Sequence, residues 1–147
     1  MYIEFTLLPG FDAMQWALVI AISVHVLAAT FWAGSTFTTA RLAGAGSEKL
    51  FVPQLTAALL AIGAGSYLWH TLHEGAFGTM ERLLATGAGA AILAFVIQVT
   101  VVGGALRQLR KANPGNPGIP SRVVIGQRAA AILLAITAVT MAAARYA

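Results

Sequence analysis

Four long stretches without Asp, Glu, Lys or Arg constrain this 147-residue chain more than any other feature. They are Ala13 to Ala40, Leu50 to His73, Leu83 to Leu106 and the shorter Ala129 to Ala144. A helix needs about 20 apolar residues to cross about 30 Å of hydrocarbon, and the fourth stretch reaches that length if the side chain of Arg128 extends to the interface. The sequence therefore predicts a single membrane domain, 1–147, with spans at about 13–37, 51–73, 83–106 and 124–145.

Composition supports helices in a membrane. Hydrophobic residues make up 59% of the chain and charged residues 10%, and the mean hydropathy is +0.80. The apolar runs do not alternate with a period of two, and a lone span must satisfy its backbone polar groups internally. The predicted fold class is an all-α integral membrane protein, a bundle of four transmembrane helices. Since cysteine is absent, disulfides and thiolate metal sites are excluded.

The distribution of basic residues predicts how the bundle is oriented. Seven of the nine basic residues fall in the first and third connections, whereas Arg82 and Arg145 lie on the other side. The seven are Arg41, Lys49, Arg107, Arg110, Lys111, Arg122 and Arg128. The positive-inside rule then places both termini and the middle connection outside, and we expect a multi-pass protein of the bacterial inner (cytoplasmic) membrane. Because these residues flank apolar runs, no nucleic-acid partner is expected.

His25 lies near the middle of the first apolar run, in "AISVHVLAATFWAGS". An ionisable side chain at that depth is costly, so it should face the bundle interior and have a partner or ligand. One interpretation is a neutral imidazole hydrogen-bonded to Gln98 or Thr100 of the third span. The other is a ligand to a cofactor, for which the nearby small residues leave room. Trp32, two helical turns away on the same face, is then a candidate cofactor contact.

The run "HVLAATFWAGS" resembles the first helix of small bacterial proteins grouped with the copper-resistance D family and with HemJ-type protoporphyrinogen oxidases. "AIGAGSYLW" and "AITAVTMAAARYA" resemble the second and closing helices of such proteins. The resemblance implies a four-helix membrane bundle that binds b-type haem, with His25 as an axial ligand, and a redox or copper-linked role. HemJ-type proteins continue with Leu-Pro-Arg and another histidine, whereas "STFTTARLAGAG" offers only Arg41, which argues against protoporphyrinogen oxidation.

Two axial ligands of one haem should lie at similar depth. If each span is centred on its charge-free run, His25 lies close to the midplane, and at 1.5 Å per residue His70 lies about 13 Å and His73 about 17 Å toward the outside. A single haem bound by His25 and His70 is therefore not expected in one protomer. His25 as the lone axial ligand, His25 paired with its copy in a homodimer, and a second haem at His70 stay open, with the Met141 thioether as a further ligand.

The segment "HTLHE" places His70, His73 and Glu74 within one helical turn of one another. Two imidazoles and a carboxylate are a ligand set for Cu(II) or Zn, so a copper-handling protein is the alternative function. The plainer interpretation is a group of polar side chains at a helix end near the interface. The order differs from that of zinc proteases, in which glutamate follows the first histidine directly.

Arg107 and Arg128 either fix the orientation of the bundle or hold a haem propionate. The leading hypothesis is an integral-membrane haem b protein that transfers electrons or oxidises a small molecule. A non-catalytic subunit that packs through glycine- and alanine-rich faces is a third hypothesis. The expected partners are the lipid bilayer, with a second copy of the chain and a redox protein as further candidates.

Overall fold

The computed structural model describes residues 12–73, 75, 77–112 and 118–147. Within these ranges all regular secondary structure is helical, and no strand is present. The elements are α1 (Ala13–Arg41), α2 (Ser47–Leu72), α3 (Thr79–Ile97), the π-helix η1 (Gln98–Val102), α4 (Gly103–Ala112) and α5 (Ser121–Ala144). Because α3, η1 and α4 form one continuous rod, the described chain has four helices long and apolar enough to span a membrane. The predicted all-helical, four-span organisation is confirmed to that extent.

Local capping interactions set where two of these helices begin. The Asp12 carboxylate accepts a hydrogen bond from the Gln15 backbone N–H at 2.8 Å, and the Gln15 side chain accepts one from the Asp12 backbone N–H at 3.3 Å. At the start of α3, the Glu81 carboxylate accepts from the Gly78 backbone N–H at 2.8 Å. Such caps satisfy backbone donors that have no partner within the helix. For this reason α3 begins before its apolar run.

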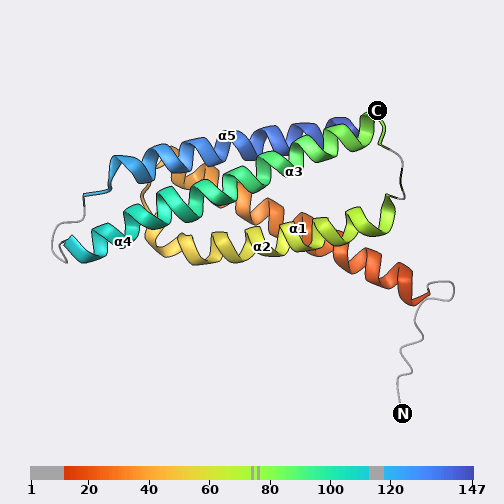
Figure 1. Cartoon of the computed structure of the whole chain (residues 1–147). Helices are drawn as coiled ribbons and strands as arrows, with labels where there is room; N and C mark the ends of the chain where they lie inside the picture. The colour runs from red at the N-terminus through yellow and green to blue at the C-terminus, as the bar shows by residue number, and fades with distance from the viewer. Residues whose placement is uncertain (1–11, 74, 76, 113–117) are drawn as a thin grey trace, which may run out of the picture.

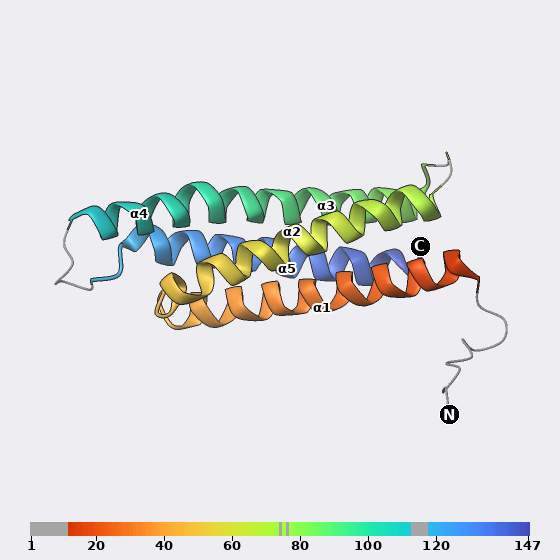
Figure 2. The same ribbon diagram turned by 90° about the horizontal axis from the view of Figure 1, so that it is seen from below.

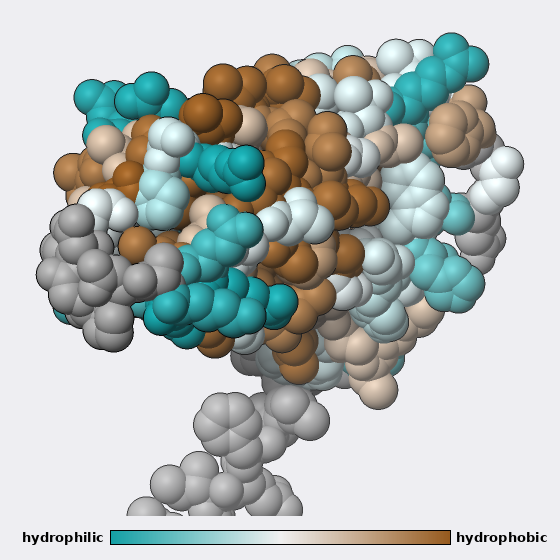
Figure 3. Space-filling view, turned by 60° about the vertical axis from the view of Figure 1, so that its left-hand side comes forward, coloured by the Kyte–Doolittle hydropathy of each residue, from teal (hydrophilic) through white to brown (hydrophobic). Residues whose placement is uncertain are grey.

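The helices pack as two pairs (Figures 1 and 2). The α1 helix packs along α2, the α3 helix packs along α5, and α1 also contacts α5, whereas α2 and α3 make few contacts. One end of the bundle comprises the α1–α2 turn, α4 and the start of α5. Because it carries the seven basic residues of the first and third connections, we call it the basic end. Figure 3 turns this end forward and shows hydrophilic side chains there, with a hydrophobic surface along the helices behind.

The core is built mainly from alanine. Its buried members are Ala28, Trp32, Ala57, Ala58, Ala61, Ala91, Ala94, Ala130 and Leu134. Small side chains let helix backbones approach closely, which favours helix association in a membrane. Trp32 is the one aromatic ring in this cluster, and only 2% of its surface is exposed.

Burial differs between the two halves of the bundle. Among the residues that the structure describes, α1 contributes no buried residue before Ala28, and α2 contributes none after Ala61. The α3 and α5 helices stay in contact beyond that level, since the Thr137 hydroxyl donates to the Gly87 carbonyl at 3.0 Å. The α1–α2 pair thus diverges from the α3–α5 pair toward the end opposite the basic end, as Figure 1 shows.

Gly87 of α3 packs closely against α5, and we predict that Gly87→Ala weakens the bundle. The added Cβ would lie 2.6 Å from Thr140 Oγ1 and 3.3 Å from Met141 Cγ. Overpacking of this kind costs about 1–3 kcal/mol, to be measured as the free energy of unfolding in mixed micelles. Gly89→Ala is the matched control, because nothing lies within 4 Å of its Cβ position. Equal stabilities of the two variants would contradict this account of the α3–α5 contact.

Candidate functional site

His25 bonds to the backbone of the neighbouring helix. Its Nδ1 lies 2.8 Å from the Ala61 carbonyl oxygen of α2. A carbonyl oxygen only accepts hydrogen bonds, so Nδ1 must carry the proton and donate it. In the neutral imidazole the lone pair is then on Nε2. No hydrogen bond joins Nε2 to any residue within the described part of the chain.

The expected hydrogen bond from His25 to Gln98 or Thr100 is absent. Gln98 bonds to other side chains, and the Thr100 hydroxyl donates to the Val96 carbonyl of its own helix at 2.7 Å. The imidazole instead reaches α2, where the backbone supplies the acceptor. The predicted bond from His25 to Gln98 or Thr100 is therefore wrong, since the observed partner is the Ala61 carbonyl.

Gly65 makes room for the His25 ring. A Cβ at this position would lie 2.9 Å from His25 Cε1 and 3.1 Å from His25 Nδ1. Any side chain here would push the ring away from the Ala61 carbonyl, one helical turn earlier on α2. The half-buried ring also lies where the packed core ends, since α1 has no buried residue between Ala13 and Ala28 among those described. His25 is thus held on its Nδ1 side and unbonded on its Nε2 side.

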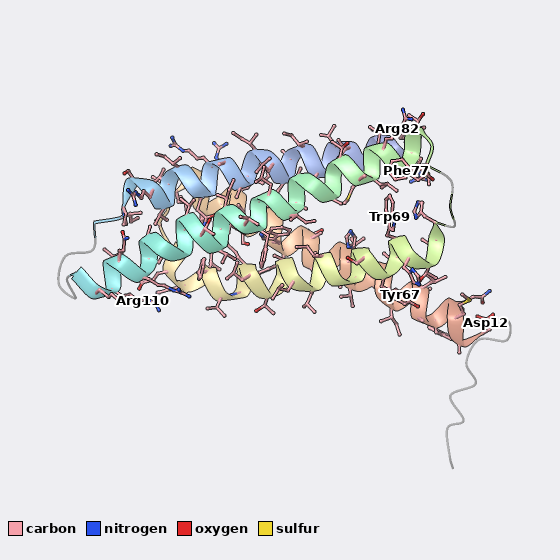
Figure 4. All side chains as sticks on the ribbon, in the orientation of Figure 1. Asp12, Tyr67, Trp69, Phe77, Arg82 and Arg110 are labelled. Carbon is pink, nitrogen blue, oxygen red and sulfur yellow. The ribbon has the colours of Figure 1, made fainter. Side chains whose placement is uncertain are left out.

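The other two histidines lie farther along α2. His70 follows Gly65 by five residues, about 7.5 Å at the helical rise, and its side chain is exposed. The ring of His73 stacks on Trp69 with centroids 4.8 Å apart, and both of its nitrogens are buried without a hydrogen-bond partner. Figure 4 shows Trp69 near the end of α2 and Phe77 in the loop before α3; their ring centroids are 6.5 Å apart.

The copper or zinc set predicted at His70, His73 and Glu74 includes one residue outside the described ranges, Glu74. Among the described residues, no group of three or more His, Asp or Glu side chains could hold a metal ion. The predicted copper site stays a prediction.

The most extensively bonded side chains lie in the basic half of the bundle. Gln98, at the start of η1, accepts from the Trp32 indole at 2.6 Å and donates to the Thr36 hydroxyl at 3.0 Å. It also donates to the Gln127 oxygen of α5 at 3.4 Å. Gln127 in turn donates to Ser47 Oγ at 3.4 Å and to Gln54 Oε1 at 3.3 Å. We call these side chains the amide network; its members are Trp32, Thr36, Ser47, Gln54, Gln98 and Gln127, all buried.

Trp32 sets the direction of every bond in the amide network. An indole nitrogen donates and never accepts, so Gln98 must turn its oxygen toward Trp32 and its NH2 group toward Gln127. Gln127 must then present its oxygen to Gln98 and its NH2 group to Gln54. The chain of amides ends at Gln54 Nε2, which is buried without a partner. One aromatic side chain thus orients three amides on three other segments.

Two further predicted cofactor contacts, Trp32 and Arg128, make no hydrogen bond to His25 within the described part of the chain. The Trp32 nitrogen is already occupied by Gln98, and Arg128 of α5 is exposed. Met141 of α5 lies against Gly87 of α3. The glutamines of the amide network were missed as a group, although three polar residues within apolar spans were a visible signal.

Gln98 is the junction of the amide network, so Gln98→Leu should destabilise the protein. The substitution leaves the Trp32 donor and the Gln127 oxygen buried and unpaired, which costs about 1–3 kcal/mol of unfolding free energy. Thr100→Val is the control, because that hydroxyl bonds within its own helix and is exposed. In a double-mutant cycle, Trp32→Phe and Gln98→Leu should be less than additive; additive effects would show that the two side chains are not coupled.

Comparisons of the chain with protein-family models, with curated proteins and with solved structures gave no match. The resemblance to copper-resistance D and HemJ-type proteins accordingly stays a prediction. The site is defined by its geometry alone: a histidine anchored through Nδ1 and a buried amide network nearer the basic end.

Proposed function

We propose that the chain is an integral membrane protein whose four helices span the bacterial cytoplasmic membrane. Exposed large apolar side chains on all four spans support insertion. The concentration of Arg and Lys at the basic end supports a cytoplasmic location for that end, with both termini outside.

Within that membrane, the function best supported is that of a b-type haem protein with a redox role. The single observation that carries it is the hydrogen bond from His25 Nδ1 to the Ala61 carbonyl. Metal-binding histidines almost always donate their second ring N–H to a carbonyl, carboxylate or water, which fixes the tautomer and the ring orientation. His25 has this arrangement, and its Nε2 would be the nitrogen that holds the iron.

The surroundings of His25 support ligand binding on one side of the ring only. Gly65 lets the imidazole pack against α2 on its Nδ1 side, and the ring is only half-buried where the buried residues of α1 end. A bound haem b would supply one-electron chemistry at its iron. The chain would supply the His25 nitrogen, hold its ring through the Ala61 carbonyl, and exclude water with apolar helices.

The proposal depends less on the other residues predicted to contact a cofactor. The face of the Trp32 ring could touch the cofactor, but its nitrogen is committed to Gln98. Arg128 could hold a propionate only if its exposed side chain folds back along α5. His70 and His73, farther along α2, are candidates for a second haem or a metal ion near the outer surface.

We expect the detergent-purified protein, expressed with adequate haem, to show a Soret band that His25→Ala removes. His70→Ala is the comparison and should keep the band, because that exposed side chain lies about 7.5 Å beyond Gly65 along α2. Added imidazole should restore the band to His25→Ala, which separates loss of the ligand from loss of the fold. A colourless parent protein that cannot be reconstituted would refute the haem function, and full haem in His25→Ala would refute the ligand.

The fit of His25 against Gly65 gives a second test. Gly65→Ala places a methyl group 2.9 Å from His25 Cε1, so the ring must move and its bond to Ala61 must weaken. Loss of such a supporting hydrogen bond typically lowers metal affinity about 10–100-fold, measurable by haem titration. Gly63→Ala should bind haem normally, since nothing lies within 4 Å of its Cβ position. Equal haem affinities for the two variants would contradict the proposed role of Gly65.

A further inference from the structure

An open apolar groove of about 570 Å³ runs along the surface between α1 and α2. Its walls are Val24, Leu27, Ala28 and Phe31 of α1 and Val52, Pro53, Thr56, Ala57 and Leu60 of α2. The one hydroxyl among them, that of Thr56, donates to the Val52 carbonyl at 3.1 Å. The groove therefore offers no unsatisfied polar group, and its occupant must be a hydrocarbon.

Two basic residues lie on the same helix faces as the groove. On α2, Lys49 precedes Pro53, Thr56 and Leu60 at spacings of four, seven and eleven residues, which place all four on one face. On α1, Arg41 follows Leu27 by fourteen residues, four helical turns, and so lies on the same face. Both charges stand beyond the end of the groove that points toward the basic end.

These two cations have no acidic partner among the described residues. Among the residues described at this end, the one ion pair joins Glu48 to Arg110 at 3.1 Å, so the carboxylate next to Lys49 is already neutralised. Between the groove and Arg41 the surface stays open, because nothing lies within 4 Å of the Cβ position of Gly34. Two positive charges without an acidic partner at the end of an apolar groove match a ligand with a hydrocarbon chain and an anionic headgroup.

We propose that this groove binds an anionic phospholipid, with an acyl chain along α1 and α2 and its phosphate held by Lys49 and Arg41. Val52 is three residues from Lys49, about 4.5 Å along the helix, so a chain in the groove brings its headgroup to the lysine. The site rests on the proposed membrane insertion and is independent of haem. Resistance of the chain to extraction by alkaline carbonate tests insertion separately from lipid binding.

Native mass spectrometry of the protein in detergent with equal amounts of phosphatidylglycerol and phosphatidylcholine tests the site. The parent protein should retain phosphatidylglycerol preferentially, each of Lys49→Gln and Arg41→Gln should lower that adduct about fivefold, and the two substitutions together should lower it further. The matched control is Arg107→Gln with Lys111→Gln, which removes two charges at the same end but on α4 and should leave the adduct unchanged. Equal loss in both pairs, or no preference in the parent, would overturn the proposal.

Filling the groove tests the acyl-chain part. Thr56→Trp should reduce adducts of both lipids severalfold, whereas Val139→Trp, on the exposed surface of α5, should not. Circular dichroism and size-exclusion profiles matching the parent confirm that each variant is folded. Undiminished lipid adducts in Thr56→Trp, or a dimer mass that this substitution abolishes, would overturn the proposal, the second result because a copy of the chain would then cover the groove.

Discussion

The hydrogen bond from the Trp32 indole to the Gln98 oxygen is the interaction on which the rest of the bundle depends. At 2.6 Å between two buried side chains, it joins α1 to η1. Because the indole only donates, it orients Gln98, and through Gln98 it orients Gln127 and Gln54. Each amide oriented in this way lies on a different segment, so this one bond influences how α1, η1, α5 and α2 meet. In a membrane, where apolar surface alone does not hold helices together, such contacts and close packing do.

The α1–α2 pair diverges from the α3–α5 pair in the half opposite the basic end, because the contacts that join the two pairs lie near the basic end. The amide network and the alanine core hold α1 and α2 against α5 and η1 near the basic end. Beyond Ala28 and Ala61 the α1–α2 pair contributes no further buried residue among those described, and His25 stands at that limit. His25 lies two helical turns from Trp32 on α1, and the amide network also reaches α2 through the bond from Gln127 to Gln54. The network therefore joins both of the helices that meet where His25 contacts Ala61. A structural contact in one half thereby positions the candidate ligand in the other.

The helices were predictable from the sequence, but their contacts were predictable only in part. Uninterrupted apolar runs predict spans whatever the neighbouring helices do, so four long helices followed from composition and charge. The π turn at Gln98–Val102 was not visible, because no residue type encodes it. The partner of His25 was also missed, since the acceptor is a backbone carbonyl and every residue carries one. Gln54, Gln98 and Gln127 are polar residues within the predicted spans, but they were not recognised as a group, because pairing them requires the rotation of each helix about its axis.

The central claim is that His25 keeps its proton on Nδ1 and leaves Nε2 free to bind iron. Nitrogen-15 magnetic resonance of ring-labelled histidine in haem-free protein, assigned by comparison with His25→Ala, tests it most directly. The account predicts a protonated Nδ1 in a hydrogen bond and an unprotonated Nε2, with the Nε2 signal changing most when haem is added. A proton on Nε2, or an Nδ1 without a proton, would contradict it, because the nitrogen offered to iron would not be available.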